Sequence, residues 1–428
     1  MRVLMFGWEF PPHIAGGLGT ACKGIVEGLA HNGVETIFVM PSASGDEDQT
    51  YTTIINASDV AVADVCGEVD EFIDKVKFIK VDSNMQPYYD PQDFDRIVEE
   101  EKKRQSAEYR LRFGQKFKFS GKYGANLLDE VARYAQVGGT IALEHAGEFD
   151  VIHAHDWLTY LAGIAAKEIS GKPLVVHVHA TSFDRGTDDM VDSRVYAIER
   201  RGMEAADRVV TVSDLTRNIV INKYGIDPAK VVTVHNAVDF SGKEDLEVER
   251  GVKDKVVTFL GRITFQKGPE YFIDAAAKVL KRTKNVRFVM AGSGDMMTRA
   301  IRQVARLGIS DRFHFTGFLR GQEVQKMFAL SDVYIMPSVS EPFGISPLEA
   351  MRTNVPSIIS KQSGAAEVLK YALKVDFWDV DALADDIYAL VRYPALSEFA
   401  AKQGYDEVNN LKWNNATAKL KQVYESII

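Results

Sequence analysis

Cysteines, long apolar runs and an excess of positive charge are all scarce or missing in this chain of 428 residues. The two cysteines, Cys22 and Cys66, are too few for a disulfide framework and have no metal-ligand spacing, so we expect a reducing, cytoplasmic location. The longest apolar runs have about six residues, against about 20 for a membrane span, so we expect no transmembrane segment. The first residues, 1–6, are too short an apolar run for a signal peptide and predict a β-strand instead.

Positive charge is in deficit, since 51 lysines and arginines face 60 aspartates and glutamates, for a formal net charge of −9. Nucleic-acid binding draws most of its affinity from cationic contacts with phosphates, so we expect no nucleic-acid partner. The apolar share of 46% and the charged share of 26% exclude a disordered or fibrous chain. At roughly 150 residues per domain, the length allows two or three domains.

Short apolar runs rich in β-branched residues recur along the chain, each followed by a polar or glycine-rich turn. Strands buried on both faces of a parallel sheet have this composition. One series comprises residues 3–6, 36–40, 151–153, 174–178, 208–212 and 231–234, and another comprises residues 255–260, 286–290, 313–316, 333–336 and 356–359. Helical periodicity separates the runs, for example at residues 21–31, 271–281 and 296–307, so we predict an α/β fold of two doubly wound, Rossmann-like domains.

The break between the two series falls at residues 239–254, a charged segment with two glycines and no strand signal. We predict an interdomain linker there, a first domain over residues 1–240 and a second over residues 253–404. Residues 61–136 contain no convincing series of parallel strands and predict an insertion in the first domain. Ligands of open α/β sheets bind at the carboxyl ends of the strands, so we expect the site in the cleft between the domains.

A basic segment of this insertion, residues 102–122, holds eight lysines and arginines, one glutamate and interleaved aromatic residues. One interpretation is a solvated helix whose aromatic stripe packs on the core. A second is a border of the cleft that contacts a polymeric or anionic acceptor. Nucleic-acid binding is a third interpretation, against which the overall charge argues.

Two glycine-containing loops follow strands and precede helices, as loops that hold phosphate groups do. Gly16 and Gly17 follow the first strand, where backbone N–H groups favour an anion, although a plain tight turn also fits and the dinucleotide fingerprint is absent. Arg262 and Lys267 follow the strand that ends at Leu260, and two cations at a strand-to-helix turn suit a diphosphate. The alternative for this second loop is a pair of solvated surface cations.

Two carboxylates stand eight residues apart, Glu341 in a loop with proline and glycine and Glu349 inside the following helix. Ser346, Pro347 and Glu349 match a capping box with proline at the first helical position, which offers a structural explanation for Glu349. Glu341 has no such local explanation, so it is the stronger candidate for chemistry.

Histidines alternate on two strand ends, His153 and His155 on one and His177 and His179 on the other. Residues i and i+2 of a strand face the same side, so a zinc site made from the two pairs is conceivable. No carboxylate or cysteine with metal-ligand spacing accompanies them, and we expect no metal. We expect His153 and His177 to be satisfied core residues and His155 and His179 to lie further out, at the cleft.

Taken together, these motifs resemble those of retaining GT-B glycosyltransferases of the family-4 type, close to bacterial and archaeal glycogen and starch synthases, and the resemblance covers nearly the whole chain. The specific pattern is E-x7-E with Glu-Pro-Phe-Gly at residues 341–344, placed after Gly-Arg-x-x-x-x-Lys-Gly at residues 261–268. Gly-Gly-Leu at residues 16–18 and His-x-His-Asp-Trp at residues 153–157 are similar to the glucan-synthase branch. The resemblance implies two domains facing a central cleft and a C-terminal helix, within residues 405–428, that crosses back to the first domain.

The family also implies a role for each position that matches its motifs. It places Arg262, Lys267 and the backbone of Gly16 and Gly17 at the donor diphosphate, Glu341, His179 and Asn236 at the donor sugar, Glu349 at the ribose and Asp156 at the acceptor. It implies no metal and no cofactor besides the donor, UDP-glucose or ADP-glucose, because the cations take the electrostatic role of a metal. Family members that use ADP-glucose usually carry a lysine where Ile14 stands, which favours UDP, and their Pro-Asn-Gly turn reads His-Asn-Ala at residues 235–237.

We therefore expect a hexosyltransferase that moves glucose, with retention, to the non-reducing end of an α-1,4-glucan, as in glycogen and starch biosynthesis. A transferase of the same fold that acts on a lipid, a small sugar or a surface polysaccharide is the first alternative. A nucleotide-sugar 2-epimerase and a non-catalytic glucan-binding module are alternatives of other classes. The Glu-Pro-Phe-Gly segment and the Asp-Trp pair argue against the epimerase, and the presence of Glu341, Arg262 and Lys267 argues against the binding module.

Overall fold

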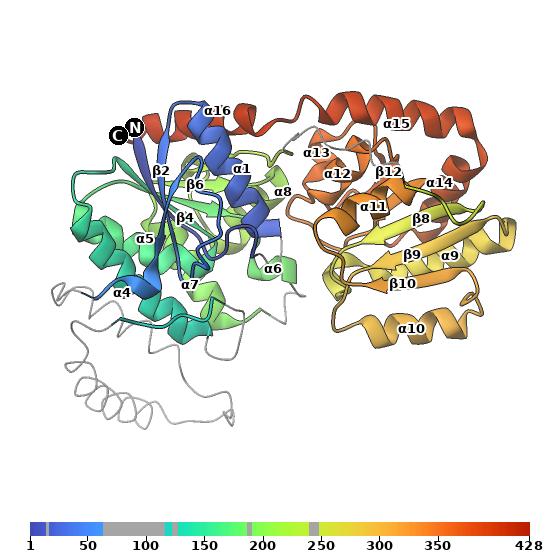
Figure 1. The fold of residues 1–428 in the computed structure, drawn as a ribbon, viewed down its shortest axis with the longest axis horizontal. Helices are drawn as coiled ribbons and strands as arrows, with labels where there is room; N and C mark the ends of the chain where they lie inside the picture. Colours follow the sequence, from blue (N-terminus) through green and yellow to red (C-terminus); the bar gives the residue numbers. More distant parts are fainter. Residues whose placement is uncertain (14–16, 63–115, 122–126, 186–190, 239–247) are drawn as a thin grey trace, which may run out of the picture.

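The computed structural model describes residues 1–13, 17–62, 116–121, 127–185, 191–238 and 248–428. The molecule is elongated, with one parallel sheet in each half and helices around each sheet (Figure 1). The two halves lie side by side, and the chain enters the second half only after the first sheet is complete. This arrangement confirms the predicted α/β fold of two parallel-sheet, Rossmann-like domains.

The strands are short and almost entirely buried along the middle of each sheet. In spatial order, the seven-stranded first sheet consists of β3 (Thr53–Asn56), β2 (Glu35–Met40), β1 (Arg2–Phe6), β4 (Val151–His155), β5 (Leu174–Val178), β6 (Arg208–Thr211) and β7 (Val231–Thr233). The six-stranded second sheet consists of β10 (Phe313–Gly317), β9 (Val286–Ala291), β8 (Lys255–Leu260), β11 (Val333–Met336), β12 (Ser357–Ser360) and β13 (Leu373–Val375). Neighbouring strands pair in parallel, so their carboxyl ends share one edge of each sheet.

Helices connect these strands and cover the sheets. The first half contains α1 (Gly17–His31), α4 (Leu127–Glu144), α5 (Trp157–Ser170), α6 (Ser182–Arg185), α7 (Ser193–Ala205) and α8 (Asp214–Tyr224). The second half contains α9 (Pro269–Arg282), α10 (Met297–Arg306), α11 (Gln322–Leu330), α12 (Ser346–Arg352), α13 (Ala365–Val368), α14 (Val380–Arg392) and α15 (Pro394–Val408). None of the helices in the described part of the chain has the length and apolar character that a membrane crossing requires.

The last helix, α16 (Trp413–Glu425), returns to the first half and packs on α1 (Figure 1). Gly24 and Gly28 make this close approach possible, because a Cβ atom at Gly24 would lie 2.2 Å from the Trp413 ring and one at Gly28 would lie 2.6 Å from the Thr417 hydroxyl. The boundary predicted between residues 404 and 405 falls inside α15, and the backbone leaves the helix only after Val408.

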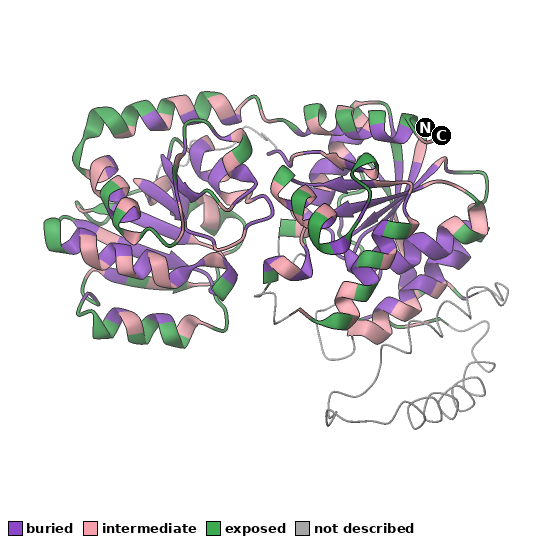
Figure 2. Cartoon of the chain, turned by 180° about the vertical axis from the view of Figure 1, so that it is seen from behind, coloured by how far each residue is buried: buried purple, intermediate pink, exposed green. Residues whose placement is uncertain are grey.

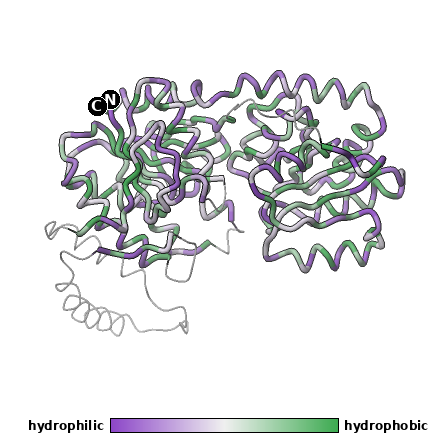
Figure 3. Tube along the Cα trace, viewed as in Figure 1, coloured by the Kyte–Doolittle hydropathy of each residue, from purple (hydrophilic) through white to green (hydrophobic). Residues whose placement is uncertain are grey.

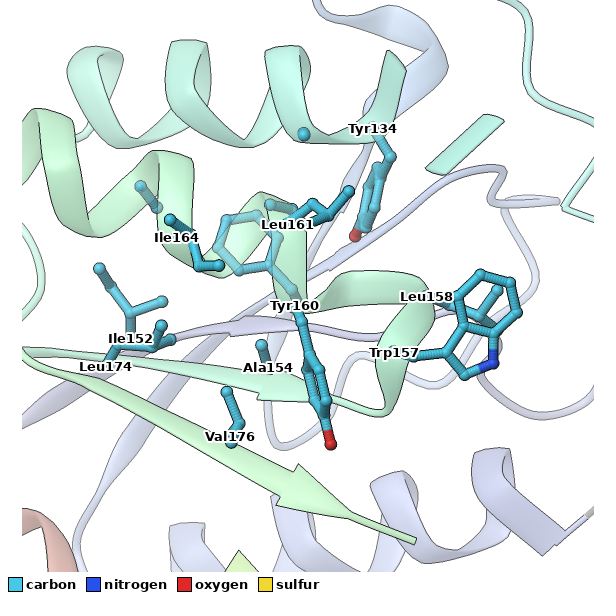
Figure 4. Close-up of a cluster of buried hydrophobic side chains, with 14 of the residues drawn as sticks. Tyr134, Ile152, Ala154, Trp157, Leu158, Tyr160, Leu161, Ile164, Leu174 and Val176 are labelled. Atoms are coloured by element: carbon cyan, nitrogen blue, oxygen red, sulfur yellow. The ribbon is translucent and has the colours of Figure 1, made fainter. Parts of the chain in front are cut away.

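The interior of the first half is built between its sheet and the paired helices α4 and α5. Figure 4 shows the Tyr160 side chain, from α5, beside the strand residues Ala154 and Val176. Tyr134 of α4 is fully buried, and its hydroxyl donates to the carbonyl oxygens of Gly7 and Val39 at 3.1 and 2.8 Å. Figures 2 and 3 show the same layering in both halves, with buried, apolar strands inside and exposed, polar helix faces outside.

Every predicted strand is present, but the edge strands β3 and β13 were not predicted. Both are short and only partly buried, so neither has the continuous apolar run that marks a central strand. Of the predicted insertion, residues 63–115 lie outside the described residues, and residues 127–136 belong to α4. Of the basic segment 102–122, only residues 116–121 are described, and there Phe119 is buried with its ring 6.0 Å from that of Tyr134.

Candidate functional site

The predicted site residues lie where the carboxyl ends of the two sheets meet. In the first half, His155 is the last residue of β4, Asp156 is the residue before α5, and His179 follows β5. In the second half, Arg262 follows β8 and Glu341 follows β11. The two halves touch beside these residues, because the Ser340 hydroxyl donates to the Asp184 carboxylate at 2.7 Å. The arrangement therefore places the loop of Glu341 against the segment that follows His179.

The loop after β8 is held in a fixed shape by glycine. Gly268 has a φ of +67°, and a Cβ atom there would lie 2.1 Å from the carbonyl oxygen of Pro337, so only glycine fits between the short 3₁₀ turn Phe265–Lys267 and α9. The Arg262 side chain lies on the exposed side of this loop, with its guanidinium 3.5 Å from the Gln266 side-chain oxygen. Two cations thus lie at the start of α9, where an anion is favoured.

Lys267 and Glu341 form an ion pair at the centre of the site. Their side chains are 21% and 9% exposed, so the pair is largely removed from water. The Glu341 backbone is fixed on both sides, since its N–H donates to the Gln362 carbonyl at 3.0 Å and its own carbonyl accepts from the Gly364 N–H at 2.9 Å. The carboxylate and the ammonium are therefore preorganised before any substrate arrives.

Glu349 lies in the first turn of α12, but the predicted capping box is wrong. The N-cap residue is Ile345, and Ser346 is already the first helical residue. The Ser346 hydroxyl contacts Tyr334 instead, accepting from the phenol at 2.8 Å. Burial raises the pKa of the Glu349 carboxyl, and the nearby Arg352 opposes that effect. The structural explanation for Glu349 is thereby removed.

Asp156 turns the chain sharply between β4 and α5. Its φ of 58° and ψ of 169° lie in a region that residues other than glycine seldom adopt and that costs about 1–3 kcal/mol. Its carboxylate accepts from the backbone N–H groups of His179 and Ala180 at 2.7 and 3.3 Å. Burial raises the pKa of Asp156 to about 7, with the Arg185 guanidinium and these two hydrogen bonds opposing the shift. Asp156 therefore fixes the backbone beside the sugar-site candidate His179.

The four histidines stack into one column between β4 and β5. Ring centroids are 4.2 Å apart for His153 and His155, 4.3 Å for His177 and His179, and 5.2 Å for His155 and His179. Burial lowers the pKa of each imidazole, to about 3 for His179, so all four rings are neutral at ordinary pH. His153, His155 and His177 are at most 1% exposed, so the column is a buried, uncharged cluster at the end of the first sheet.

Two expectations about these histidines were wrong. His155 is fully buried rather than further out at the cleft. His177 is buried but not satisfied, since neither of its ring nitrogens has a hydrogen-bond partner among the described residues.

His153, His155 and His177 also each bring a ring nitrogen within 4.8 Å of the others, the spacing of a possible metal site. The His177 ring, however, stacks on His153 and His155 with interplanar angles of 15° and 25°. Imidazole lone pairs lie in the ring plane, so nearly parallel rings do not direct them to one point. This geometry argues against a shared ion in the column.

The remaining predicted positions are only partly described. Gly16 lies outside the described residues, and Gly17 is the exposed first residue of α1. The N–H of Gly19 already donates to the carboxylate of Glu9 at 3.2 Å, a contact that the sequence analysis did not identify. Asn236 is 7% exposed, and its buried side-chain oxygen has no hydrogen-bond partner among the described residues.

Models of two known glycosyltransferase families match this chain, one in each half. A model described as "Glycosyltransferase Family 4" matches residues 133–241, and one described as "Glycosyl transferases group 1" matches residues 243–407. An uncharacterized glycosyltransferase of Methanocaldococcus jannaschii is 27% identical over 99% of this chain and 98% of its own length. A glycogen synthase of Mycobacterium tuberculosis is 22% identical over 99% of this chain and 94% of its own length. A D-inositol 3-phosphate glycosyltransferase of Kribbella flavida is 29% identical over 64% of this chain and 70% of its own length.

Solved structures share the fold at low sequence identity. The sucrose-phosphate synthase of Thermosynechococcus elongatus matches with a TM-score of 0.70 and 16% identity, over 99% of this chain and 98% of that one. The Anabaena protein HepE, in complex with UDP and glucose, matches with a TM-score of 0.65 and 18% identity over the whole of both chains. Both halves of the chain thus have counterparts in known structures.

Proposed function

The chain belongs to the GT-B glycosyltransferases of the family-4 type, and we propose that it transfers glucose, with retention, from a nucleotide-glucose donor to the non-reducing end of an α-1,4-glucan. The observation that carries this proposal is the ion pair of Lys267 and Glu341 at the strand ends, with Arg262 beside it. The Lys267 ammonium would bind a diphosphate and the Glu341 carboxylate would bind sugar hydroxyls, and the two groups are in direct contact. The similarity to a glycogen synthase over nearly the full length supports the glucan acceptor.

The catalytic roles follow from where charge develops. When the bond between the sugar carbon and the phosphate oxygen breaks, negative charge grows on the diphosphate, and Arg262 and Lys267 stabilise it. Removing one preorganised donor of this kind typically costs on the order of 3 kcal/mol of transition-state stabilisation. The leaving phosphate accepts the proton of the incoming hydroxyl on the same face, so no side chain needs to act as a covalent nucleophile.

The other predicted residues hold the donor in place. Glu341 and the unpartnered Asn236 orient the sugar hydroxyls, His179 lies beside the reacting carbon, and Glu349 holds the ribose. Asp156 borders the acceptor and, through its two backbone hydrogen bonds, fixes the segment of His179. Closure of the two halves excludes water that would otherwise hydrolyse the donor. The cations take the place of a metal, so the reaction needs no divalent ion.

We favour UDP-glucose over ADP-glucose as the donor. HepE binds UDP with glucose in the same fold, and Ile14 replaces the lysine of enzymes that use ADP-glucose. The acceptor alternative with specific support is a small sugar, because relatives that are 29% identical are named D-inositol 3-phosphate glycosyltransferases.

The test is to offer UDP-, ADP- and GDP-glucose to the purified protein, each with and without glycogen, and to measure nucleotide release. Release of UDP that depends on glycogen and persists in excess chelator is the expected result. Nucleotide release only with inositol phosphate or a small sugar would show that the acceptor is a small molecule and not a glucan. Loss of activity in chelator that added Zn²⁺ or Mg²⁺ restores would overturn the metal-free mechanism. Lys267→Ala serves as the inactive control.

A further inference from the structure

The histidine column lies between the C-terminal helix and the predicted sugar site, with a hydrogen bond at each end. At one end, the hydroxyl of Tyr424 in α16 contacts Nδ1 of His153 at 2.8 Å. At the other end, Nδ1 of His155 contacts Nε2 of His179 at 2.9 Å. Between them, the rings of His153 and His155 stack at 4.2 Å, and Nε2 of each is buried without a partner among the described residues.

A neutral imidazole carries one proton on one of its two nitrogens, so in the contact between His155 and His179 one ring donates and the other accepts. Nε2 of His155 is buried and has no acceptor among the described residues, so a proton there would remain unpaired. A proton on Nδ1 of His155 has Nε2 of His179 as its acceptor, 2.9 Å away. This geometry favours Nδ1 as the protonated nitrogen of His155.

We propose that His155 is a positioning residue that donates from Nδ1 to Nε2 of His179 and thereby holds His179 with its proton on Nδ1. The inference rests on the proposed function, in which His179 lies beside the donor sugar. Nδ1 of His179 is buried and has no partner among the described residues, so it is a free N–H donor. A hydroxyl of the donor sugar is the acceptor that this N–H lacks.

His155, the last residue of β4, and Asp156, the residue that follows it, therefore fix His179 at two points. Asp156 accepts from its backbone N–H at 2.7 Å, and His155 holds its ring. A ring held at only one point rotates freely about its side-chain bonds, whereas one held at the backbone and at Nε2 presents Nδ1 in a single direction. Such positioning of a sugar contact affects turnover more than the binding of the nucleotide.

The decisive variants exploit the geometry of asparagine, whose side-chain NH₂ occupies the place of the Nδ1 of histidine. His155→Leu removes the donor, and we expect turnover to fall about tenfold, the loss of one hydrogen bond, with unchanged affinity for UDP. His155→Asn keeps the donor, and we expect it to restore most of that turnover. Comparable losses in both variants would indicate a packing role and overturn the proposal.

A second pair of variants separates this inference from the proposed function. We expect His179→Asn, which keeps an N–H at the Nδ1 position, to retain more turnover than His179→Gln, which keeps only the contact to His155. Full activity of both His179 variants would show that the sugar-site assignment itself is wrong. Loss of activity in both, with full activity of His155→Leu, would leave His179 in the site and overturn the role of His155.

Nitrogen NMR of the wild-type protein, labelled at histidine, tests the proton positions without any variant. We expect His179 to carry its proton on Nδ1 and His155 to carry its proton on Nδ1 as well. The His179 signals are assigned by their disappearance in His179→Gln. A proton on Nε2 of His179 would overturn the proposal, whatever the variants do.

Discussion

At the ends of β4 and β5, the first domain presents stacked, neutral imidazoles whose pKa values are lowered by burial. At the ends of β8 and β11, the second domain presents an exposed arginine and the ion pair of Lys267 and Glu341. Both faces have the same topology, parallel strands followed by helix starts, yet one avoids charge and the other concentrates it. The difference comes from side chains alone.

Under the proposed function, this contrast divides the chemistry between the domains. A diphosphate needs cations, which the exposed Arg262 and the partly buried Lys267 of the second domain would supply. A donor that must not be hydrolysed needs surroundings with little water, and the buried, uncharged histidine column lies behind His179. Hydrogen bonds to uncharged groups in such surroundings are directional without attracting ions. The predictions below test each side of this division.

The largest effect is expected for the charged face. Lys267→Ala should lower turnover by about 100-fold or more, because it removes a donor to the departing diphosphate, and it should also weaken UDP binding. Glu341→Ala should lose turnover while UDP binds as well as to wild type or better, because the ammonium is released from its ion pair. Calorimetric titration with UDP, beside a turnover assay, distinguishes the two variants.

Lys361→Ala is the matched control for this pair, since its ammonium lies in the same domain and pairs with Asp376 at 2.9 Å. Normal UDP binding by Lys267→Ala would place the phosphate site elsewhere. Turnover near the wild-type level in Glu341→Ala would remove that carboxylate from the reaction.

On the neutral face, the carboxylate of Asp156 lies beside the column, and its raised pKa of about 7 makes stability depend on pH. An acid whose folded pKa lies above its unfolded value stabilises the fold at low pH, and this contribution is lost as pH rises from about 4 to about 7. Asp156→Asn removes the titration. Its free energy of unfolding relative to wild type should therefore rise by about 4 kcal/mol between pH 4 and pH 8.

Urea denaturation at pH 4 and pH 8 measures the free energy of unfolding of both proteins. Asp156→Asn also alters the hydrogen bonds to His179 and Ala180, but that effect is the same at both pH values and cancels when the two pH values are compared. A constant offset between Asp156→Asn and wild type would mean that the carboxylate titrates normally in the folded protein.

The histidines shift stability in the opposite direction. His177 is buried, and burial together with its histidine neighbours lowers its pKa, so the unfolded chain binds a proton below about pH 6.5 that the folded chain does not. Stability is therefore lost as pH falls from that value. His177→Phe, which keeps a ring in the column, should gain about 2 kcal/mol relative to wild type at pH 5 compared with pH 8.

The same denaturation experiment provides the measurement, with exposed His31→Phe as the control for a histidine outside the column. An equal offset of His177→Phe at both pH values would show that the column accepts a proton when folded.

The smallest effect is expected where the two domains meet outside the site. Glu367 accepts from the backbone N–H groups of Asp214 and Leu215, each at 2.8 Å, and so caps α8 of the first domain from the second. Glu367→Ala should cost about 1 kcal/mol of stability, as the loss of a helix cap does. Thermal unfolding of this variant beside the exposed control Glu398→Ala tests it, and a loss no greater than that of the control would show that the cap contributes nothing.

The central strands and the site loops could be predicted from the sequence because each is a local signal. A run of apolar residues followed by Gly-Arg or by Glu-Pro-Phe-Gly identifies a strand and the loop at its carboxyl end, and sheet topology then brings those loops together. Lys267 and Glu341, 74 positions apart, lie in two such loops, although their ion pair was not itself predicted.

Other features depend on partners that the local sequence does not reveal. His155 is buried because His179 and His153 stack on it, and the contact of His153 with Tyr424 spans 271 positions. The predicted capping box at Ser346 is absent, and its hydroxyl instead accepts a hydrogen bond from Tyr334 of β11. The edge strands β3 and β13 form only because a neighbouring strand offers its backbone, so their own composition carries little signal.

The return of α16 to the first domain has a consequence for synthesis on the ribosome. Trp413, Leu420, Val423 and Tyr424 belong to the apolar cluster that packs on β1 and α1, although they are made some 400 residues later. The first domain therefore emerges with one face of its interior uncovered, while the second domain is complete before α16 is translated. The domain that is made first is thus the last to be finished, and the apolar face of α1 stays exposed to chaperones throughout elongation.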